Sequence, residues 1–207
     1  MPFFLRGLYA ITDSDLIPAE QLVDTVKLAL VGGARIIQYR DKTNDNKRRL
    51  EQAQALKQLC QQYQAAFIIN DDVKLAQQVN AGVHLGKEDQ PLSSARAILG
   101  NDAIIGISCY NQLSLAQQAV QAGATYVAFG SFFSSQIKPN AVHANLNLLR
   151  QARQSFQTPI VAIGGITPDN GAELIKAGAD SLAVIQGLFG QPDVTAAAQH
   201  YARLFST

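Results

Sequence analysis

Five charged residues stand at or just beyond the ends of short apolar runs, and their types suit the binding of a diphosphate. Arg40, Lys42 and Lys138 supply positive charge, and Asp71 and Asp89 supply two carboxylates. Mg²⁺ in proteins takes one or two carboxylates together with phosphate oxygens and water, while Arg and Lys neutralise the remaining phosphate charge. The five residues therefore predict a Mg²⁺–diphosphate pocket, with structural ion pairing as the alternative.

Several of these polar residues also have a purely structural interpretation. Asp71 and Asp72 follow a strand-like run, and either could be the N-cap of the next helix, a role that we assign to Asp72. Asp89 could cap the next helical segment, and Ser108 could be a buried hydroxyl bonded to the backbone. His84 lies within an apolar run, which favours a packed core histidine over a ligand.

A second anion site is expected where glycines follow the last two apolar runs. Gly164 and Gly165 follow the first of these runs, and Ile185, Gln186 and Gly187 follow the second. Glycine lets backbone amides approach an anion, and the loops after the seventh and eighth strands of (β/α)8 barrels commonly bind phosphate. The pattern predicts a monophosphate site, although tight turns without a ligand would use the same glycines.

Short apolar runs alternate with segments of helical period from end to end, which is typical of parallel strands joined by right-handed helical crossovers. Strands are expected at Leu8–Thr12, Arg35–Tyr39, Ala66–Ile69, Gly82–Leu85, Ile104–Ile107, Tyr126–Phe129, Ile160–Ile163 and Ser181–Val184. Helices are expected at Ala19–Leu30, Asn46–Tyr63, Val73–Val79, Leu92–Leu99, Leu113–Gln121, Leu146–Phe156, Pro168–Ala177 and Val194–Phe205.

Eight strand–helix units favour an α/β fold with a single closed TIM barrel over an open doubly wound sheet. The open sheet would normally carry a glycine fingerprint in its first turn, whereas that turn here is Thr12-Asp13-Ser14-Asp15. In a barrel the active site lies at the carboxyl ends of the strands, and strand alternation points Gln38 and Arg40 into the barrel mouth. Glycines that end helices in a left-handed conformation are expected before the even-numbered strands, at Gly33, Gly82, Gly123 and Gly178.

Composition and charge narrow the class of protein. The 207 residues show no linker or compositional break, so we expect one domain over residues 1–207. Seventeen Lys and Arg against sixteen Asp and Glu give a net charge of +1, which argues against nucleic-acid binding. No signal peptide or membrane span is expected, which favours a cytoplasmic location. A homodimer is expected only because small barrels often pair, and Cys60 and Cys109 are assigned no chemistry.

The polar motifs, taken together, resemble those of the thiamine-phosphate synthase family, from about Leu8 to Phe189. The resemblance rests on motifs in the family's order and spacing: Gln38-Tyr39-Arg40-Asp41-Lys42, Ile69-Asn70-Asp71, Val83-His84-Leu85-Gly86-Lys87-Glu88-Asp89, Gly106-Ile107-Ser108, Lys138-Pro139 and Ala162-Ile163-Gly164-Gly165-Ile166-Thr167-Pro168. It implies a TIM barrel transferase that joins hydroxymethylpyrimidine diphosphate to hydroxyethylthiazole phosphate. The products are thiamine phosphate and pyrophosphate, and the C–O bond breaks largely before the C–N bond forms.

The resemblance also implies roles for individual residues. Asp71 and Asp89 would bind Mg²⁺, and Gln38 would lie near the pyrimidine ring. The diphosphate would be surrounded by Arg40, Lys42, Asn70, Ser108 and Lys138, of which Arg40, Lys42, Ser108 and Lys138 are expected to act in catalysis. The thiazole phosphate would meet Gly165, Ser135, Ile185 and Gln186.

Two departures from the family pattern keep other functions open. The Thr-x-Thr that commonly precedes the lysine is Ser135-Gln136-Ile137 here, and Gln186 stands where the family often has serine. The phosphate contact of that serine would pass to backbone amides or to the Gln186 side chain. The alternatives are a thiazole tautomerase of the same fold, which needs no metal, and a catalytically weakened phosphate-binding paralogue.

Overall fold

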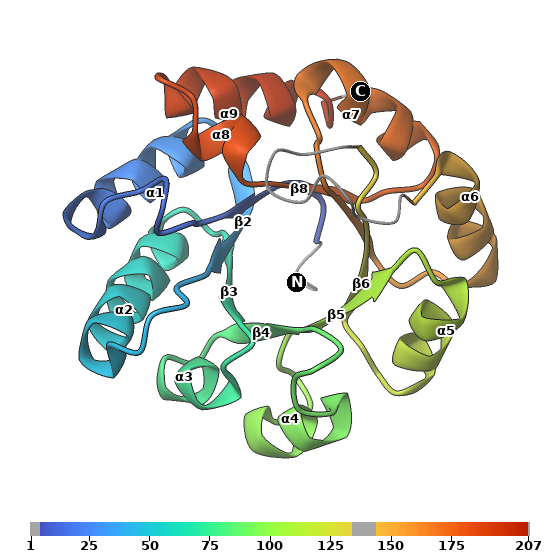
Figure 1. Ribbon diagram of the computed structural model, residues 1–207, viewed down its shortest axis with the longest axis horizontal. Coiled ribbons are helices and arrows are strands. Elements are labelled where there is room, and N and C mark those ends of the chain that lie inside the picture. The colour runs from blue at the N-terminus through green and yellow to red at the C-terminus, as the bar shows by residue number, and fades with distance from the viewer. Residues whose placement is uncertain (1–4, 134–143, 207) are drawn as a thin grey trace.

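A computed structural model describes residues 5–133 and 144–206. Within these ranges, eight parallel strands close into a barrel in the order β1 to β8 (Figure 1). The strands are β1 (Gly7–Ile11), β2 (Ala34–Tyr39), β3 (Ala66–Asn70), β4 (Gly82–Leu85), β5 (Ile105–Tyr110), β6 (Tyr126–Phe129), β7 (Ile160–Ile163) and β8 (Ser181–Val184). Strands β1 and β8 pair in parallel and complete the closure, so the TIM barrel prediction is confirmed.

Helices surround the barrel and cover the outer faces of the strands (Figure 1). After a short 3-10 turn at Ala19–Gln21 they are α1 (Leu22–Val31), α2 (Asn46–Gln62), α3 (Val73–Gln78), α4 (Leu92–Leu99), α5 (Leu113–Gln121), α6 (Leu146–Ser155), α7 (Pro168–Lys176), α8 (Gln186–Phe189) and α9 (Val194–Arg203). No described helix has the length and apolar character needed to cross a membrane.

Strand alternation divides the apolar residues into two cores. Ile37 and Tyr39 point outward and pack with the helices, whereas Ile36 belongs to a core inside the barrel together with Tyr9 and Tyr126. Inward-pointing side chains near the carboxyl ends of the strands therefore meet in the barrel mouth, as the pattern of β2 predicts.

Side-chain caps fix where several helices begin. Carboxylate, amide or hydroxyl oxygens accept backbone N–H groups at the first turns of α2, α3, α6, α7 and α9; the capping residues are Asp45, Asp72, Asn145, Thr167 and Asp193. Such caps satisfy amides that have no partner within the helix. The assignment of Asp72 as a cap is confirmed, because its carboxylate accepts the N–H of Leu75 at 3.0 Å.

The glycine prediction is right at three positions and wrong at Gly82. Gly33, Gly123 and Gly178 have positive φ, whereas Asn80 at φ 51° takes the left-handed position after α3. Gly82 lies within β4 for a steric reason, since a Cβ there would stand 2.6 Å from Ile68 Cδ1 and 2.7 Å from a backbone oxygen. Asn tolerates the left-handed region, so it can replace glycine at a helix C-terminus.

Candidate active site

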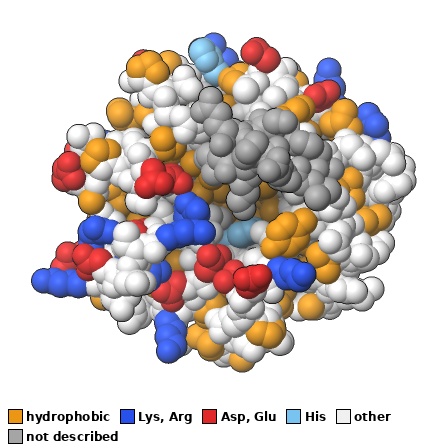
Figure 2. All heavy atoms as spheres, viewed as in Figure 1, with side chains coloured by type: hydrophobic (Ala, Val, Ile, Leu, Met, Phe, Trp, Pro, Cys, Tyr) orange, Lys and Arg blue, Asp and Glu red, His pale blue; other side chains and the backbone are white. Residues whose placement is uncertain are grey.

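The carboxyl ends of the strands enclose a cavity of about 860 Å³. The described residues that line it include eight of the expected site residues: Gln38, Arg40, Asn70, Asp71, Ser108, Gly165, Ile185 and Gln186. In Figure 2, viewed from this end, acidic and basic side chains gather beside a central hollow, over the side of the barrel formed by β2, β3 and β4. Ser135 and Lys138 lie outside the described residues.

Two carboxyl groups lie together beyond the ends of β3 and β4. Asp71 has φ 63° and accepts a hydrogen bond from Asn70 Nδ2 at 2.5 Å. The pKa of Asp71 is raised to about 6 by partial burial and by the neighbouring Asp89 carboxyl. Asp89 accepts the backbone N–H of Gly86 at 2.6 Å, and α4 begins after Pro91 without a side-chain cap, so Asp89 is not the cap of that helix.

The chemistry of this acid pair fits Mg²⁺. Within the described ranges, no group of three or more His, Cys, Asp or Glu side chains could hold a metal ion. Mg²⁺ does not need such a cage, because it commonly binds one or two carboxylates and completes its shell with water and substrate phosphate. Two carboxyl groups that repel one another, as Asp71 and Asp89 do, are stabilised when a cation is placed between them.

Positive charge approaches this acid pair from the end of β2. Arg40 Nη1 donates to Asp13 Oδ2 at 2.9 Å, and the Arg40 side chain lines the cavity. Lys42 is exposed and is not among the described cavity-lining residues, yet its charge is close enough to oppose the rise in the pKa of Asp71. Arg40 is therefore placed for direct contact with an anion in the cavity, and Lys42 for contact at its rim.

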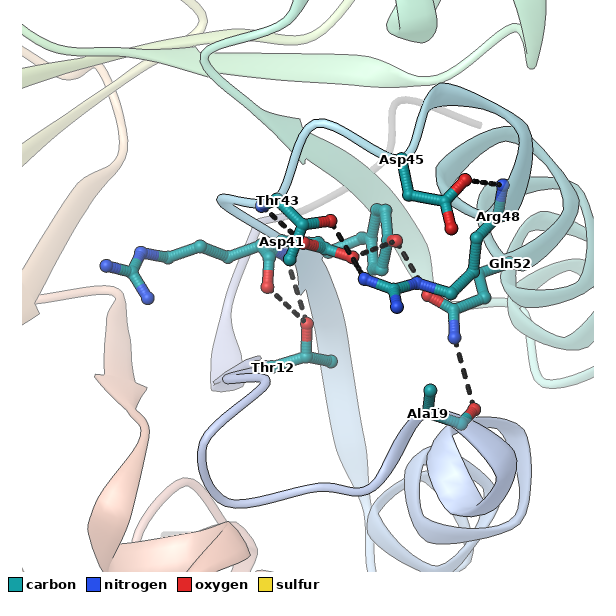
Figure 3. A network of polar contacts seen from close by, with 9 residues as sticks. Thr12, Ala19, Asp41, Thr43, Asp45, Arg48 and Gln52 are labelled. Atoms are coloured by element: carbon teal, nitrogen blue, oxygen red, sulfur yellow. Dashed lines mark hydrogen bonds and ion pairs between the residues drawn. The ribbon is translucent and has the colours of Figure 1, made fainter.

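The segment that carries these two cations is tied to its neighbours (Figure 3). Asp41 accepts the backbone N–H of Thr43 at 2.7 Å and a hydrogen bond from Arg48 Nη2 at 3.1 Å. The backbone N–H of Arg40 donates to Thr12 Oγ1 at 3.0 Å. Asp41 thus acts as a structural residue that fixes the loop between β2 and α2, and its charge is already paired.

A row of hydrogen-bonded side chains crosses the barrel interior below the cavity. It runs from Gln38 through Tyr9, Tyr126 and His84 to Ser108. Ser108 lies within β5, which continues to Tyr110, and its hydroxyl contacts His84 Nε2, so the expected bond to the backbone is not found. The expectation of a packed core histidine is only half right, because the ring of His84 also lines the cavity.

Tyr9, Tyr126 and Asp13 belong to the site although their place in it was not expected from the sequence. A signal for Tyr9 was present, since it alternates with Ile11 along β1 and so faces the barrel interior like Gln38. Tyr126 carries the same signal, since it alternates with Ala128 along β6 and also faces the barrel interior. Asp13 follows β1 and pairs with Arg40 at the end of the neighbouring β2, so its role depends on these two strands lying side by side.

The loops after β7 and β8 lie on the other side of the cavity. Gly164 and Gly165 have φ values of 105° and 62°, and the carbonyl of Gly165 accepts Asn170 Nδ2 at 3.1 Å. The short helix α8, which the sequence did not predict, starts at Gln186. Its first backbone N–H groups have no partner within the helix.

The exposed Gln186 side chain lies over its own short helix, and Gln186 is also among the residues that line the cavity. Its Nε2 atom stands 2.5 Å from the place where a Cβ on Gly190 would be. The backbone amides and the Gln186 side chain both stay candidates for the phosphate contact. The expected site residues that the structure describes thus fall into two groups, a charged group at the ends of β2 to β5 and a group after β7 and β8.

The closed parallel barrel, with a cavity lined by charged, polar and apolar residues at its carboxyl ends, defines a TIM barrel enzyme. Comparison with protein families matches residues 8–188 to the model described as thiamine monophosphate synthase. The chain belongs to this family.

Curated relatives and solved structures agree with this assignment. A thiamine-phosphate synthase of Nitrosococcus oceani is 55% identical over 202 residues, which cover 97% of this chain and 93% of the relative. One of Alcanivorax borkumensis is 53% identical over 207 residues, covering 98% and 95% of the two chains. The structure of a thiamine phosphate pyrophosphorylase from Pyrococcus furiosus is 39% identical with a TM-score of 0.88, covering 97% of this chain and 95% of that one.

Proposed function

We propose that the cavity joins hydroxymethylpyrimidine diphosphate to hydroxyethylthiazole phosphate, releasing pyrophosphate and forming thiamine phosphate. Thiamine-phosphate synthase activity follows from family membership and from identity above 50% to curated enzymes over nearly the whole chain. The residue roles proposed here rest mainly on one observation. Asp71 lines the cavity together with Arg40, Asn70 and Ser108, and the carboxyl group of Asp89, which is not among the lining residues, lies beside that of Asp71.

The charged side of the cavity is suited to stabilising a departing diphosphate. Cleavage of the C–O bond leaves negative charge on the leaving group, and fixed donors that face this charge lower the barrier. Arg40 offers a fork of N–H groups, Asn70 an amide and Ser108 a hydroxyl, all from rigid strand ends. Asp71 and Asp89 would hold Mg²⁺, which supplies further charge neutralisation when bound. Lys42 and Lys138 are proposed to add positive charge at the rim.

The opposite side of the cavity is suited to the thiazole phosphate. Val161, Ile163 and Ala183 line it and provide apolar surface for a ring, and Gly165 and the first amides of α8 are available to a phosphate. Two substrates held on opposite sides of one cavity gain from orientation, because a reaction between two molecules becomes effectively intramolecular. Gln38, at the bottom, is proposed to orient the pyrimidine ring.

A matched pair of neighbouring acids tests the metal site. Asp71→Asn removes one proposed ligand, whereas Asp72→Asn changes an acid that caps α3 and pairs with Arg49 at 2.9 Å. We expect Asp71→Asn to lower turnover at least ~100-fold and to raise the Mg²⁺ concentration needed for activity. Asp72→Asn should keep the turnover and the Mg²⁺ dependence of the wild type. Equal Mg²⁺ dependence in the wild type and Asp71→Asn would contradict the assignment.

A further inference from the structure

The row of side chains below the cavity is continuous at hydrogen-bond distance. Gln38 Nε2 donates to the Tyr9 hydroxyl at 2.8 Å, and the Tyr9 and Tyr126 hydroxyls lie 2.8 Å apart. Tyr126 lies 2.9 Å from His84 Nδ1, and His84 Nε2 lies 2.8 Å from Ser108 Oγ. Five residues from β1, β2, β4, β5 and β6 are thereby connected from one side of the barrel to the other.

Burial makes the inner hydrogen bonds of the row depend on one another. Gln38, Tyr9 and Tyr126 are 3%, 1% and 0% exposed, whereas His84 and Ser108 are half-buried and border the cavity. The ring of His84 stacks on Tyr126 at 5.6 Å with an angle of 18° between the planes. A buried polar atom without a partner is costly, which favours an arrangement in which every hydrogen is used.

The first donor sets the direction of the whole row. The amide nitrogen of Gln38 can only donate, so the Tyr9 oxygen accepts and its single hydrogen goes to Tyr126. The hydrogen of Tyr126 then goes to His84 Nδ1, which must accept. The hydrogen of the neutral imidazole is left on Nε2, where Ser108 Oγ accepts it.

The protonation states needed for this order hold at neutral pH. Burial lowers the pKa of His84 to about 4, so the ring is neutral and carries one hydrogen. Burial also raises the pKa of the Tyr9 and Tyr126 hydroxyls, so both keep their hydrogens. The two tyrosine hydroxyls and the His84 ring therefore each have one hydrogen to donate.

We propose that this row is a directional relay: it holds His84 in the tautomer with its hydrogen on Nε2 and thereby commits the Ser108 hydroxyl hydrogen to an anionic oxygen in the cavity. Ser108 lines the cavity, and its oxygen already accepts from His84, so its hydrogen is free for a ligand. The ligand is the diphosphate, a step that rests on the proposed function. Tyr9, Tyr126 and His84 are then positioning residues that act through Ser108.

The opposite direction is the competing arrangement. If Gln38 accepted from Tyr9 through its oxygen, every hydrogen in the row would reverse, and His84 would carry its hydrogen on Nδ1. Ser108 would then donate to Nε2 and have no hydrogen for a phosphate. The two arrangements differ in an observable property, the tautomer of one histidine.

Nitrogen NMR of the free protein labelled with ¹⁵N-histidine distinguishes them. The chain has three histidines, and the His84 signals are assigned by their loss in His84→Gln. We expect Nδ1 of His84 to be the unprotonated nitrogen in the wild type, and Tyr126→Phe to produce a mixture of tautomers. Tyr201→Phe, which removes another buried tyrosine hydroxyl bonded at 2.9 Å to a carbonyl, should leave the tautomer unchanged. A wild-type ring protonated on Nδ1 would overturn the relay.

A double-mutant cycle with Mg²⁺ and inorganic pyrophosphate tests the destination of the hydrogen. Ser108→Ala should weaken pyrophosphate binding at least about tenfold, as expected for one hydrogen bond to a charged group. Tyr126→Phe should weaken it severalfold, and the double variant should bind like Ser108→Ala alone. Losses that multiply would overturn the proposal.

The two experiments separate two kinds of failure. If the wild type does not bind Mg²⁺ and pyrophosphate, the diphosphate site of the proposed function is wrong, and with it the destination of the Ser108 hydrogen. If binding is normal but His84 carries its hydrogen on Nδ1, the relay alone is wrong and the diphosphate site stands.

Discussion

Acidification should destabilise the protein through His84. The pKa of this ring is lowered from its ordinary value of 6.5 to about 4 by burial in the barrel, whereas the unfolded chain restores the ordinary value. Below pH 6.5 the imidazole of His84 therefore becomes protonated in the unfolded state but stays neutral in the folded state. The stability contributed by the neutral ring is complete above pH 6.5 and is lost progressively as the pH falls toward 4.

The size of the loss follows from the pKa difference. If the ring were completely shielded from solvent, the free energy of unfolding would fall by about 3 kcal/mol between pH 7 and pH 4. Because His84 also borders the cavity, solvent screening reduces this loss of stability, and we expect the free energy of unfolding to fall by about 1–2 kcal/mol. In a chain of this length that is a fall in melting temperature of roughly 3–6 °C. Thermal unfolding followed by circular dichroism at a series of pH values measures it.

Variants isolate the contribution of His84 from that of other groups. Asp71 acts in the opposite direction, because burial and then the neighbouring Asp89 raise its pKa to about 6, so that protonation stabilises the folded state. We therefore compare the pH slopes of wild type and His84→Gln, with the exposed His200→Gln as the matched control. His84→Gln should have the flatter slope, and His200→Gln the wild-type slope. Equal slopes for all three would show that the folded protein does not lower the pKa of His84 and would refute this prediction.

Three further changes test the site and its supports. Arg40→Ala should lower turnover at least ~100-fold in a steady-state assay, since Arg40 lines the cavity and is proposed to bind the diphosphate; an undiminished rate would remove Arg40 from the site. Asp72→Ala should cost about 1–2 kcal/mol in urea unfolding by removing the α3 cap, while activity of the folded protein persists. Gly106→Ala should cost about 3 kcal/mol, because its Cβ would stand 1.9 Å from Tyr126 Cζ; unchanged stability would contradict this packing.

Much of the fold was predictable because its signals are local. Alternation along β2 predicted that Gln38 and Arg40 face the barrel mouth while Tyr39 faces the helices, and the structure agrees. Asp72 was identifiable as a cap from its place before α3. The four residues of α8 were missed, because one turn of helix is too short to show a helical period.

The polar interior of the site was not predictable from these local signals. The contact between Tyr9 and Tyr126 joins residues 117 positions apart, and it depends on closure of the barrel. Gly82 illustrates the same limit, because its role is set by Ile68 and Ile104 on neighbouring segments. Residue type and spacing show that a polar group faces the interior, but the partner is fixed by the register of the assembled sheet.

The most direct test measures both products of one reaction mixture. The purified protein is incubated with hydroxymethylpyrimidine diphosphate, hydroxyethylthiazole phosphate and Mg²⁺, and pyrophosphate and thiamine phosphate are quantified together. We expect equal amounts of the two products, and loss of both when the metal is chelated. Pyrophosphate without thiamine phosphate, or undiminished product formation after chelation, would contradict this expectation.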